Sequence, residues 1–220
     1  ARRYVWAWLD YCQGVDGGNT EGAQYWQYGM DNFLPFALAL DRTLGHDDGL
    51  LAHPSIRRAM NMVRAGLTND GGLHGVNDTI PLPVGGAVAW FAAGRFGDRL
   101  GLWYGDHCRR TLAARRAAGQ PTAYGASPLQ ALLFRPDVPE EVSAPPLPTV
   151  FRLDDIQCAV ARSSPEWDCA LVAGLKGSRP PYTHHNQPDT GSFSLDVRGE
   201  RLLIDPGYYK PDPTHHCLPV

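Results

Sequence analysis

The sequence predicts an α+β fold in which a helical first part precedes an antiparallel sheet. Apolar residues recur at helical spacing up to Phe134, a proline-dense stretch follows, and short β-rich runs fill the rest of the chain. With 220 residues, the chain is long enough to bury a sizeable core. We expect two domains, 1–135 and 149–220, joined by a linker at 136–148.

The first part is predicted to be a series of helical hairpins, which is compatible with an α/α toroid. The expected helices are 2–13, 19–44 with a bend at Pro35, one beginning at His53, 85–96, 100–118 and 127–134. Asn19 or Thr20 is expected to cap the second helix, because short polar side chains accept hydrogen bonds from free amides. A long loop rich in Gly, Asp, Asn and Pro, of the kind that often carries function, occupies 67–84.

The second part is predicted to form strands. The expected runs are 150–161, 169–175, 192–197 and 201–205, and the last two are joined by a hairpin turn at 198–200. Because side chains alternate across a strand, Phe193 and Leu195 share one face and Ser194 and Asp196 the other.

Composition excludes several classes of protein. Hydrophobic residues make up 43% and charged residues 20%, which is ordinary globular composition. The net charge is -3 without a long basic run, so nucleic-acid binding is not indicated, and no stretch approaches the roughly 20 apolar residues of a membrane span. The five cysteines lack CxxC spacing and indicate buried thiols. Both termini have the pattern of chain within a fold, so we expect a fragment of a longer protein.

Polar side chains of the second predicted helix form a stripe. Glu21, Tyr25, Tyr28 and Asn32 recur at helical spacing, and two phenols beside a carboxylate fit a substrate cleft. Tyrosines that are partly buried in the core, with satisfied hydroxyl groups, are the alternative. Both interpretations are open at this point.

A polar loop before the predicted hairpin concentrates possible ligands. His184, His185 and Asp189 are candidates for a metal cluster, although adjacent histidines point apart in an extended chain. A simple polar turn is the alternative, since Asn, Pro, Asp and Gly all favour turns. His74 and Asn77, in the earlier long loop, either line a cleft or shape that loop.

Three segments together resemble a known family. EGAQYWQYG at 21–29, NDGGLHGVNDT at 69–79 and HHNQPDTGSFSLDVRGERLLIDPG at 184–207 resemble the heparinase II/III-like polysaccharide lyases. That family includes heparin, heparan sulfate and oligoalginate lyases. The resemblance implies an incomplete (α/α) toroid followed by the start of an antiparallel sandwich domain. It also implies β-elimination on an acidic, uronate-containing polysaccharide or oligosaccharide, and a periplasmic or secreted location.

The resemblance assigns roles to particular residues. Tyr25 matches the catalytic tyrosine, with Tyr28 as the second match, and His185 matches the catalytic histidine. The residue that neutralises the substrate carboxylate is expected upstream of residue 1. Positions expected to bind substrate are Glu21, His74, Asn77 and His184.

The expected chemistry requires no cofactor, but many members of the family hold a structural zinc ion. Asp205 matches one zinc ligand, whereas Gln187 stands where the family has a histidine, and Gln is a poor zinc ligand. This departure motivates a second hypothesis, a carbohydrate-binding member without catalysis. A metal-dependent hydrolase that uses His184, His185 and Asp189 is the third hypothesis.

Overall fold

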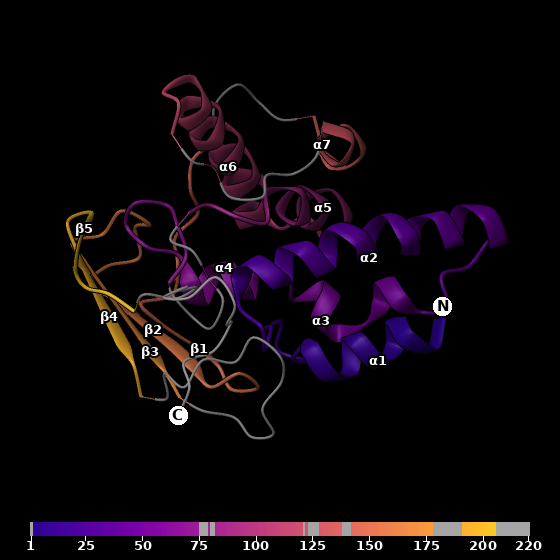
Figure 1. Cartoon of the computed structure of the whole chain (residues 1–220), viewed down its shortest axis with the longest axis horizontal. Helices are drawn as coiled ribbons and strands as arrows, with labels where there is room; N and C mark the ends of the chain where they lie inside the picture. The colour runs from indigo at the N-terminus through magenta and orange to yellow at the C-terminus, as the bar shows by residue number, and fades with distance from the viewer. Residues whose placement is uncertain are drawn as a thin grey trace, which may run out of the picture.

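The computed structural model describes residues 2–74, 79, 82–120, 122, 128–137, 142–177 and 191–205. Within this part of the chain the fold is α+β, as the sequence predicts, with a sheet at one end of a group of helices (Figure 1). The helices are α1 Arg2–Cys12, α2 Ala23–Leu44, the 3-10 helix η1 Leu50–Ala52, α3 Pro54–Arg57, α4 Asn61–Gly66, α5 Gly86–Phe96, α6 Arg99–Ala117 and α7 Pro128–Phe134. The strands are β1 Val150–Leu153, β2 Cys158–Arg162, β3 Leu171–Lys176, β4 Phe193–Val197 and β5 Glu200–Leu203. No helix in these ranges is long and apolar enough to cross a membrane.

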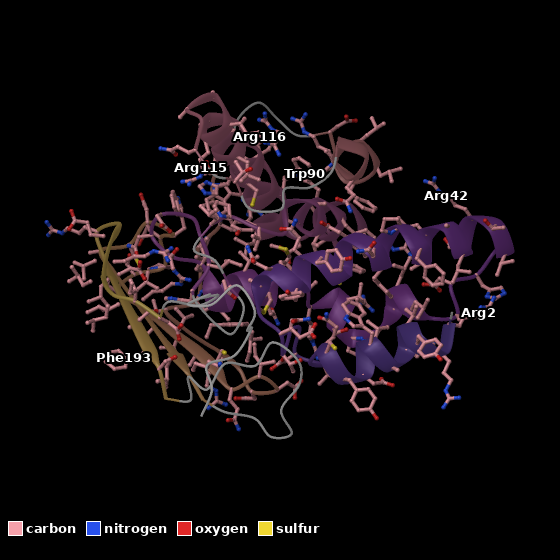
Figure 2. The ribbon with its side chains drawn as sticks, viewed as in Figure 1. Arg2, Arg42, Trp90, Arg115, Arg116 and Phe193 are labelled. Atoms are coloured by element: carbon pink, nitrogen blue, oxygen red, sulfur yellow. The ribbon has the colours of Figure 1, made fainter. Side chains whose placement is uncertain are left out.

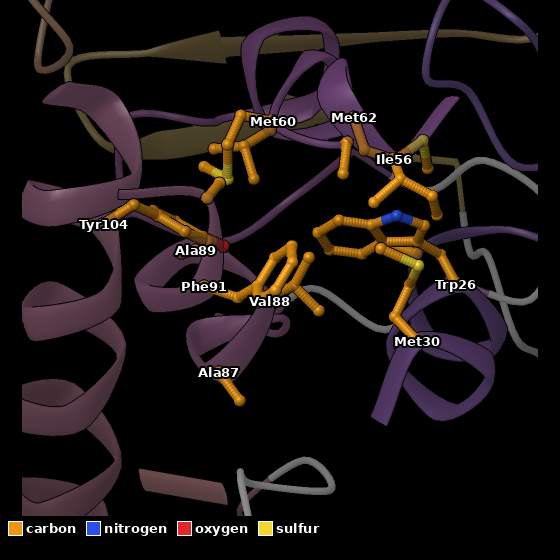
Figure 3. Close-up of a cluster of buried hydrophobic side chains, with 14 of the residues drawn as sticks. Trp26, Met30, Ile56, Met60, Met62, Ala87, Val88, Ala89, Phe91 and Tyr104 are labelled. Atoms are coloured by element: carbon orange, nitrogen blue, oxygen red, sulfur yellow. The ribbon is translucent and has the colours of Figure 1, made fainter. Parts of the chain in front are cut away.

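The helices share an apolar core. Trp26 and Met30 of α2 are buried and belong to one cluster with Ile56 of α3 and Val88 of α5 (Figure 3). The same cluster continues to Leu153 at the end of β1, so apolar packing joins the helices to the first strands. At roughly 25 cal/mol per Å² of apolar surface, this burial is the main stabilising contribution to the fold.

The five strands pair in sequence order, each antiparallel to the next. Four residues of neighbouring strands lie side by side across the sheet: Arg162, Val172, Asp196 and Arg201. Three of the four are charged, and the first three are buried. The row beside these four, on the opposite face, is Ala161, Ala173, Leu195 and Leu203. The sheet therefore turns charged groups toward the helices and leaves an apolar outer face with exposed Leu175 and Phe193.

Three expectations about local structure need correction. Helix α2 begins after Gly22 and has no side-chain cap; buried Asn19 instead accepts a hydrogen bond from the amide of Glu21. The helix expected after His53 is two short helices, α3 and α4, because the chain turns at 58–60. The run 150–161 is a hairpin, in which Gln157 takes a positive φ of 52°.

Three other features remain predictions. The toroid and the division into domains at 136–148 are not tested by the described helices and strands. Within the expected linker, Leu147 is buried in the shared core, and its amide donates to the carbonyl of Pro165. The third feature is the sandwich domain. The apolar outer face of the sheet is the kind of surface that a second sheet covers in a sandwich.

Close packing of α1 on α2 depends on a glycine. A Cβ atom at Gly29 would lie 2.3 Å from Cζ2 of Trp8. We expect Gly29→Ala to lower the free energy of unfolding by about 1–3 kcal/mol, because the indole has to move out of its packed position. Urea unfolding of the purified protein measures this.

Gly94→Ala is the matched control, since Gly94 lies within α5 and an added Cβ would meet no atom within 4 Å. It should stabilise the protein by about 0.5–1 kcal/mol, the ordinary gain for alanine in a helix. Equal effects of the two substitutions would contradict the packing argument.

Candidate functional site

Tyr25, Tyr28 and Asn32 of α2 line an open groove of about 630 Å³ between α1 and α2, and Glu21 joins them from the turn before the helix. We call this groove the Tyr25 groove. Its walls include Tyr4, Trp8, Glu21, Tyr25, Tyr28 and Phe36. The structure thus brings together three residues that the sequence predicts to act together, Glu21, Tyr25 and Tyr28.

The groove is positioned by the opposite side of α2. Trp26 and Met30 on that side are fully buried, which fixes the rotation of the helix and turns Tyr25 and Tyr28 outward. Tyr28 is 65% exposed, and its carbonyl accepts a hydrogen bond of 2.7 Å from Nδ2 of Asn32. Tyr25 is half-buried, and Glu21 beside it is also partly covered.

Aromatic rings from both helices extend the groove. Trp8 of α1 packs against Phe33 of α2, with ring centroids 5.7 Å apart. Exposed aromatic faces are suited to stacking on sugar rings, because the apolar face of a pyranose covers a ring well. Among the described lining residues, the only charged side chain belongs to Glu21.

A second set of predicted residues lies between the helices and the sheet. His74 is only 5% exposed, and its Nδ1 lies 2.6 Å from Oγ of Ser194 on β4. Asp205, just after β5, accepts a hydrogen bond of 2.5 Å from the hydroxyl of Ser192. His74 and Asp205 line the same small pocket, together with buried Lys176.

Burial dominates the electrostatics of His74. It lowers the pKa of the imidazole to about 3, with a further contribution from the guanidinium groups of Arg162 and Arg201. The ring is therefore neutral at ordinary pH, and its role as a substrate-binding residue stays a prediction. Its Nε2 has no hydrogen-bond partner among the described residues.

Charged residues that the sequence analysis did not single out surround His74. Arg201 of β5 forms an ion pair of 3.0 Å with Asp70 and one of 3.6 Å with Asp196. Burial would raise the pKa of Asp70, but the hydrogen bond from Thr68 and the charge of Arg201 outweigh it and lower the pKa. These groups tie the 67–74 loop to the sheet.

A backbone contact strengthens the same junction. Arg162 of β2 is buried, and its Nη2 donates to the carbonyl of Leu67 over 2.6 Å. The side-chain amide of Asn69 donates to the carbonyl of Cys169. The sequence carried no pattern for this network, because β2 has a single charged residue, Arg162, and β5 begins with the adjacent pair Glu200 and Arg201.

The described residues do not assemble a zinc site. In the ranges that the structure covers, no group of three or more His, Cys, Asp or Glu side chains could hold a metal ion. The pocket at Asp205 contributes one carboxylate and one imidazole, and the buried amine of Lys176 disfavours a second cation there. Zinc therefore stays a prediction.

Several predicted residues lie outside the described part of the chain. These are Asn77, His184, His185, Gln187 and Asp189. Their predicted roles in catalysis, substrate binding and metal binding are untested by the structure.

Comparison with known proteins gives a likeness of fold. No protein-family model matches the sequence, and no curated protein matches it. The fold is similar to that of heparan sulfate lyase HepC from Pedobacter heparinus, with a TM-score of 0.60 and 18% identity over 96% of this chain and 29% of that chain. It is also similar to a heparinase III, the BT4657 gene product, with a TM-score of 0.59 and 14% identity over 97% of this chain and 29% of that one.

A further structure, titled heparinase III, is similar with a TM-score of 0.60 and 16% identity, over 94% of this chain and 30% of the other. The chain therefore spans less than a third of the length of the structures that it resembles. At these identities the likeness shows a shared heparinase-like fold.

Proposed function

We propose that this chain is part of a polysaccharide lyase that cleaves an acidic, uronate-containing glycan by β-elimination. The observation that carries the proposal is the Tyr25 groove, where two tyrosines of α2 and the carboxylate of Glu21, in the turn before that helix, meet aromatic rings. The fold likeness to proteins that are titled heparan sulfate lyase and heparinase III supports it.

β-Elimination makes three chemical demands on a site. A base removes the proton from the carbon beside the uronate carboxylate, and the electron pair forms a double bond with the neighbouring carbon. The bond from that neighbouring carbon to the glycosidic oxygen breaks, and an acid delivers a proton to the oxygen. Negative charge that develops on the carboxylate has to be stabilised by hydrogen bonds or a cation.

Tyr25 fits the role of acid in this scheme. A free phenol titrates at about 10, so it is protonated at neutral pH and needs positive neighbours to become a base. We assign proton donation to Tyr25 and proton removal to His185, with Tyr28 and Glu21 holding the sugar.

Incubation of the full-length protein with heparan sulfate, heparin, alginate and oligoalginate tests the proposal. The new double bond is conjugated with the carboxylate, so we expect ultraviolet absorbance to rise with at least one of these glycans. A neutral polymer such as cellulose, which has no uronate carboxylate, should give no rise. Absence of any rise across a broad uronate panel would overturn the proposal.

A carbohydrate-binding protein without catalysis is the second candidate. The observation that favours it is the aromatic lining of the groove, which suits sugar binding without any proton transfer. In that case glycans bind without product, and Tyr25→Phe binds them as the parent protein does.

A further inference from the structure

The Tyr25 groove extends well beyond Tyr25 itself. On α2 its lining residues continue from Tyr25 to Phe36. At 1.5 Å per residue, the helix rises by about 16 Å between these two side chains. The volume of about 630 Å³ lies within the range that is usual for ligand-binding clefts. Because a sugar ring is comparable in width to an aromatic ring, the groove has room for several sugar units.

Tyr4 lies at the far end of the groove. Helices α1 and α2 form its two walls and run in opposite directions (Figure 1). Trp8 of α1 packs against Phe33 and leaves no room for a Cβ atom at Gly29, so the middle of α1 lies against the middle of α2. Tyr4, one turn before Trp8, therefore lies further toward the C-terminal end of α2. The ring of Tyr4 and the ring of Tyr25 line opposite ends of the groove.

The Tyr25 end of the groove is the end nearer the sheet. Figure 2 shows Arg2, at the start of α1, and Arg42, near the end of α2, on the opposite side of the molecule from Phe193 of the sheet. Tyr4 is two residues after Arg2 and lies at that far side. A glycan chain that reaches Tyr25 can therefore continue along the groove, away from the sheet.

The side chains along this path suit a sugar chain. Tyr4 is 80% exposed, so the face of its ring is open to a ligand, and half-buried Phe36 lines the same end. Between the two ends lie the exposed side chains of Tyr28 and Asn32, which can bond sugar hydroxyl groups. A pyranose has apolar faces and polar edges, and it matches a groove that offers both. Since the groove is open, the carboxylates of an acidic chain stay hydrated.

We propose that Tyr4 forms a distal subsite of the Tyr25 groove and stacks on a sugar unit that lies beyond the bond cleaved at Tyr25. Chains long enough to reach Tyr4 then bind more tightly than chains that end short of it. Tyr4 thus sets the preferred length of the substrate. This inference rests on the proposed function, because it takes a glycan as the occupant of the groove.

Calorimetric titration with size-defined oligosaccharides tests the subsite. The probes are heparan sulfate and alginate oligosaccharides of two, four and six sugar units, and the full-length protein carries Tyr25→Phe to stop cleavage. With at least one of the two glycans, we expect the hexasaccharide to bind about tenfold more tightly than the disaccharide. Adding Tyr4→Ala should remove most of this gain, whereas Tyr4→Phe keeps the ring and should retain it.

Tyr11→Ala is the matched control. Tyr11 is also an exposed tyrosine of α1, at 76%, and it does not line the groove. Its substitution should leave the affinity for the hexasaccharide within about twofold. An affinity that does not depend on chain length, or equal losses for Tyr4→Ala and Tyr11→Ala, would overturn the proposal.

Two further results would assign the groove to another occupant. If the parent protein dimerises in sedimentation and Tyr4→Ala is monomeric, a second copy of the chain occupies the groove. If Tyr4→Ala lowers the Tm of the full-length protein by several degrees and Tyr11→Ala does not, the protein's own chain covers Tyr4. Either result contradicts a sugar subsite.

The subsite and the proposed lyase activity fail independently. Length-dependent binding that Tyr4→Ala removes supports the subsite even when no glycan is cleaved. Glycan cleavage together with equal affinities for all three chain lengths overturns the subsite and leaves the lyase standing.

Discussion

Tyr25→Phe is expected to lower the rate of glycan cleavage by about 10²–10⁴-fold, the range in which a positioned acid or base contributes. The substitution removes only the phenol oxygen and keeps the ring that forms part of the groove wall. Glycan binding should therefore change little, so the loss appears in kcat rather than in KM. Initial rates from the absorbance assay, over a series of glycan concentrations, separate the two constants.

Two further tyrosines serve as controls for this experiment. Tyr28→Phe alters the groove one turn further along α2 and should affect KM more than kcat. Tyr11→Phe changes an exposed tyrosine of α1 that does not line the groove, and it should leave both constants unchanged. If Tyr25→Phe retains full activity, or if all three variants lose activity alike, Tyr25 is not the proton donor.

The stripe that forms the groove could be predicted from the sequence because it depends on local geometry. Helical spacing places Tyr25 and Tyr28 together on α2, whereas Glu21, expected on the same helix, lines the groove from the turn before it. Helix periodicity likewise located α5 and α6 to within a residue or two. Trp8 could not be assigned to the same groove, because nothing local indicates that α1 packs on α2 through Gly29.

The junction between helices and sheet could not be predicted for the same reason. Its contacts join residues far apart in the chain: His74 to Ser194, Arg162 to Leu67, and Arg201 to Asp70. Alternation along β4 correctly separates Ser194 and Asp196 from Phe193 and Leu195. It does not reveal that the polar face turns inward, against the usual tendency of sheets to bury their apolar face.

His74 also gives the protein a specific sensitivity to acid. Its pKa is about 3 in the folded protein and about 6.5 in an unfolded chain, so the unfolded state binds more protons between these values. The contribution of His74 to the free energy of unfolding is therefore fully present above pH 6.5, and it is lost as the pH drops toward 3. The expected loss from this group alone is on the order of 3–5 kcal/mol.

The charged groups around His74 account for the direction of this effect. An imidazolium ion there would lie near the guanidinium groups of Arg162 and Arg201, and the charge of Asp70 offsets them in part. Protonation is consequently accompanied by loosening of the 67–74 loop from the sheet, since the ring is held between them. Asp70, whose own pKa is lowered, contributes a further loss below pH 3.8.

His74→Gln should remove most of this dependence. Glutamine retains a polar group that can reach Ser194 but does not ionise, so we expect a cost of about 1 kcal/mol at pH 7 and a net gain at pH 4. Urea unfolding at both pH values measures the two free energies. His46→Gln, at an exposed histidine after α2, should keep the acid sensitivity of the parent. If the free energy of unfolding falls equally between pH 7 and pH 4 in the parent protein and in His74→Gln, the acid sensitivity comes from other groups, because glutamine cannot bind the proton.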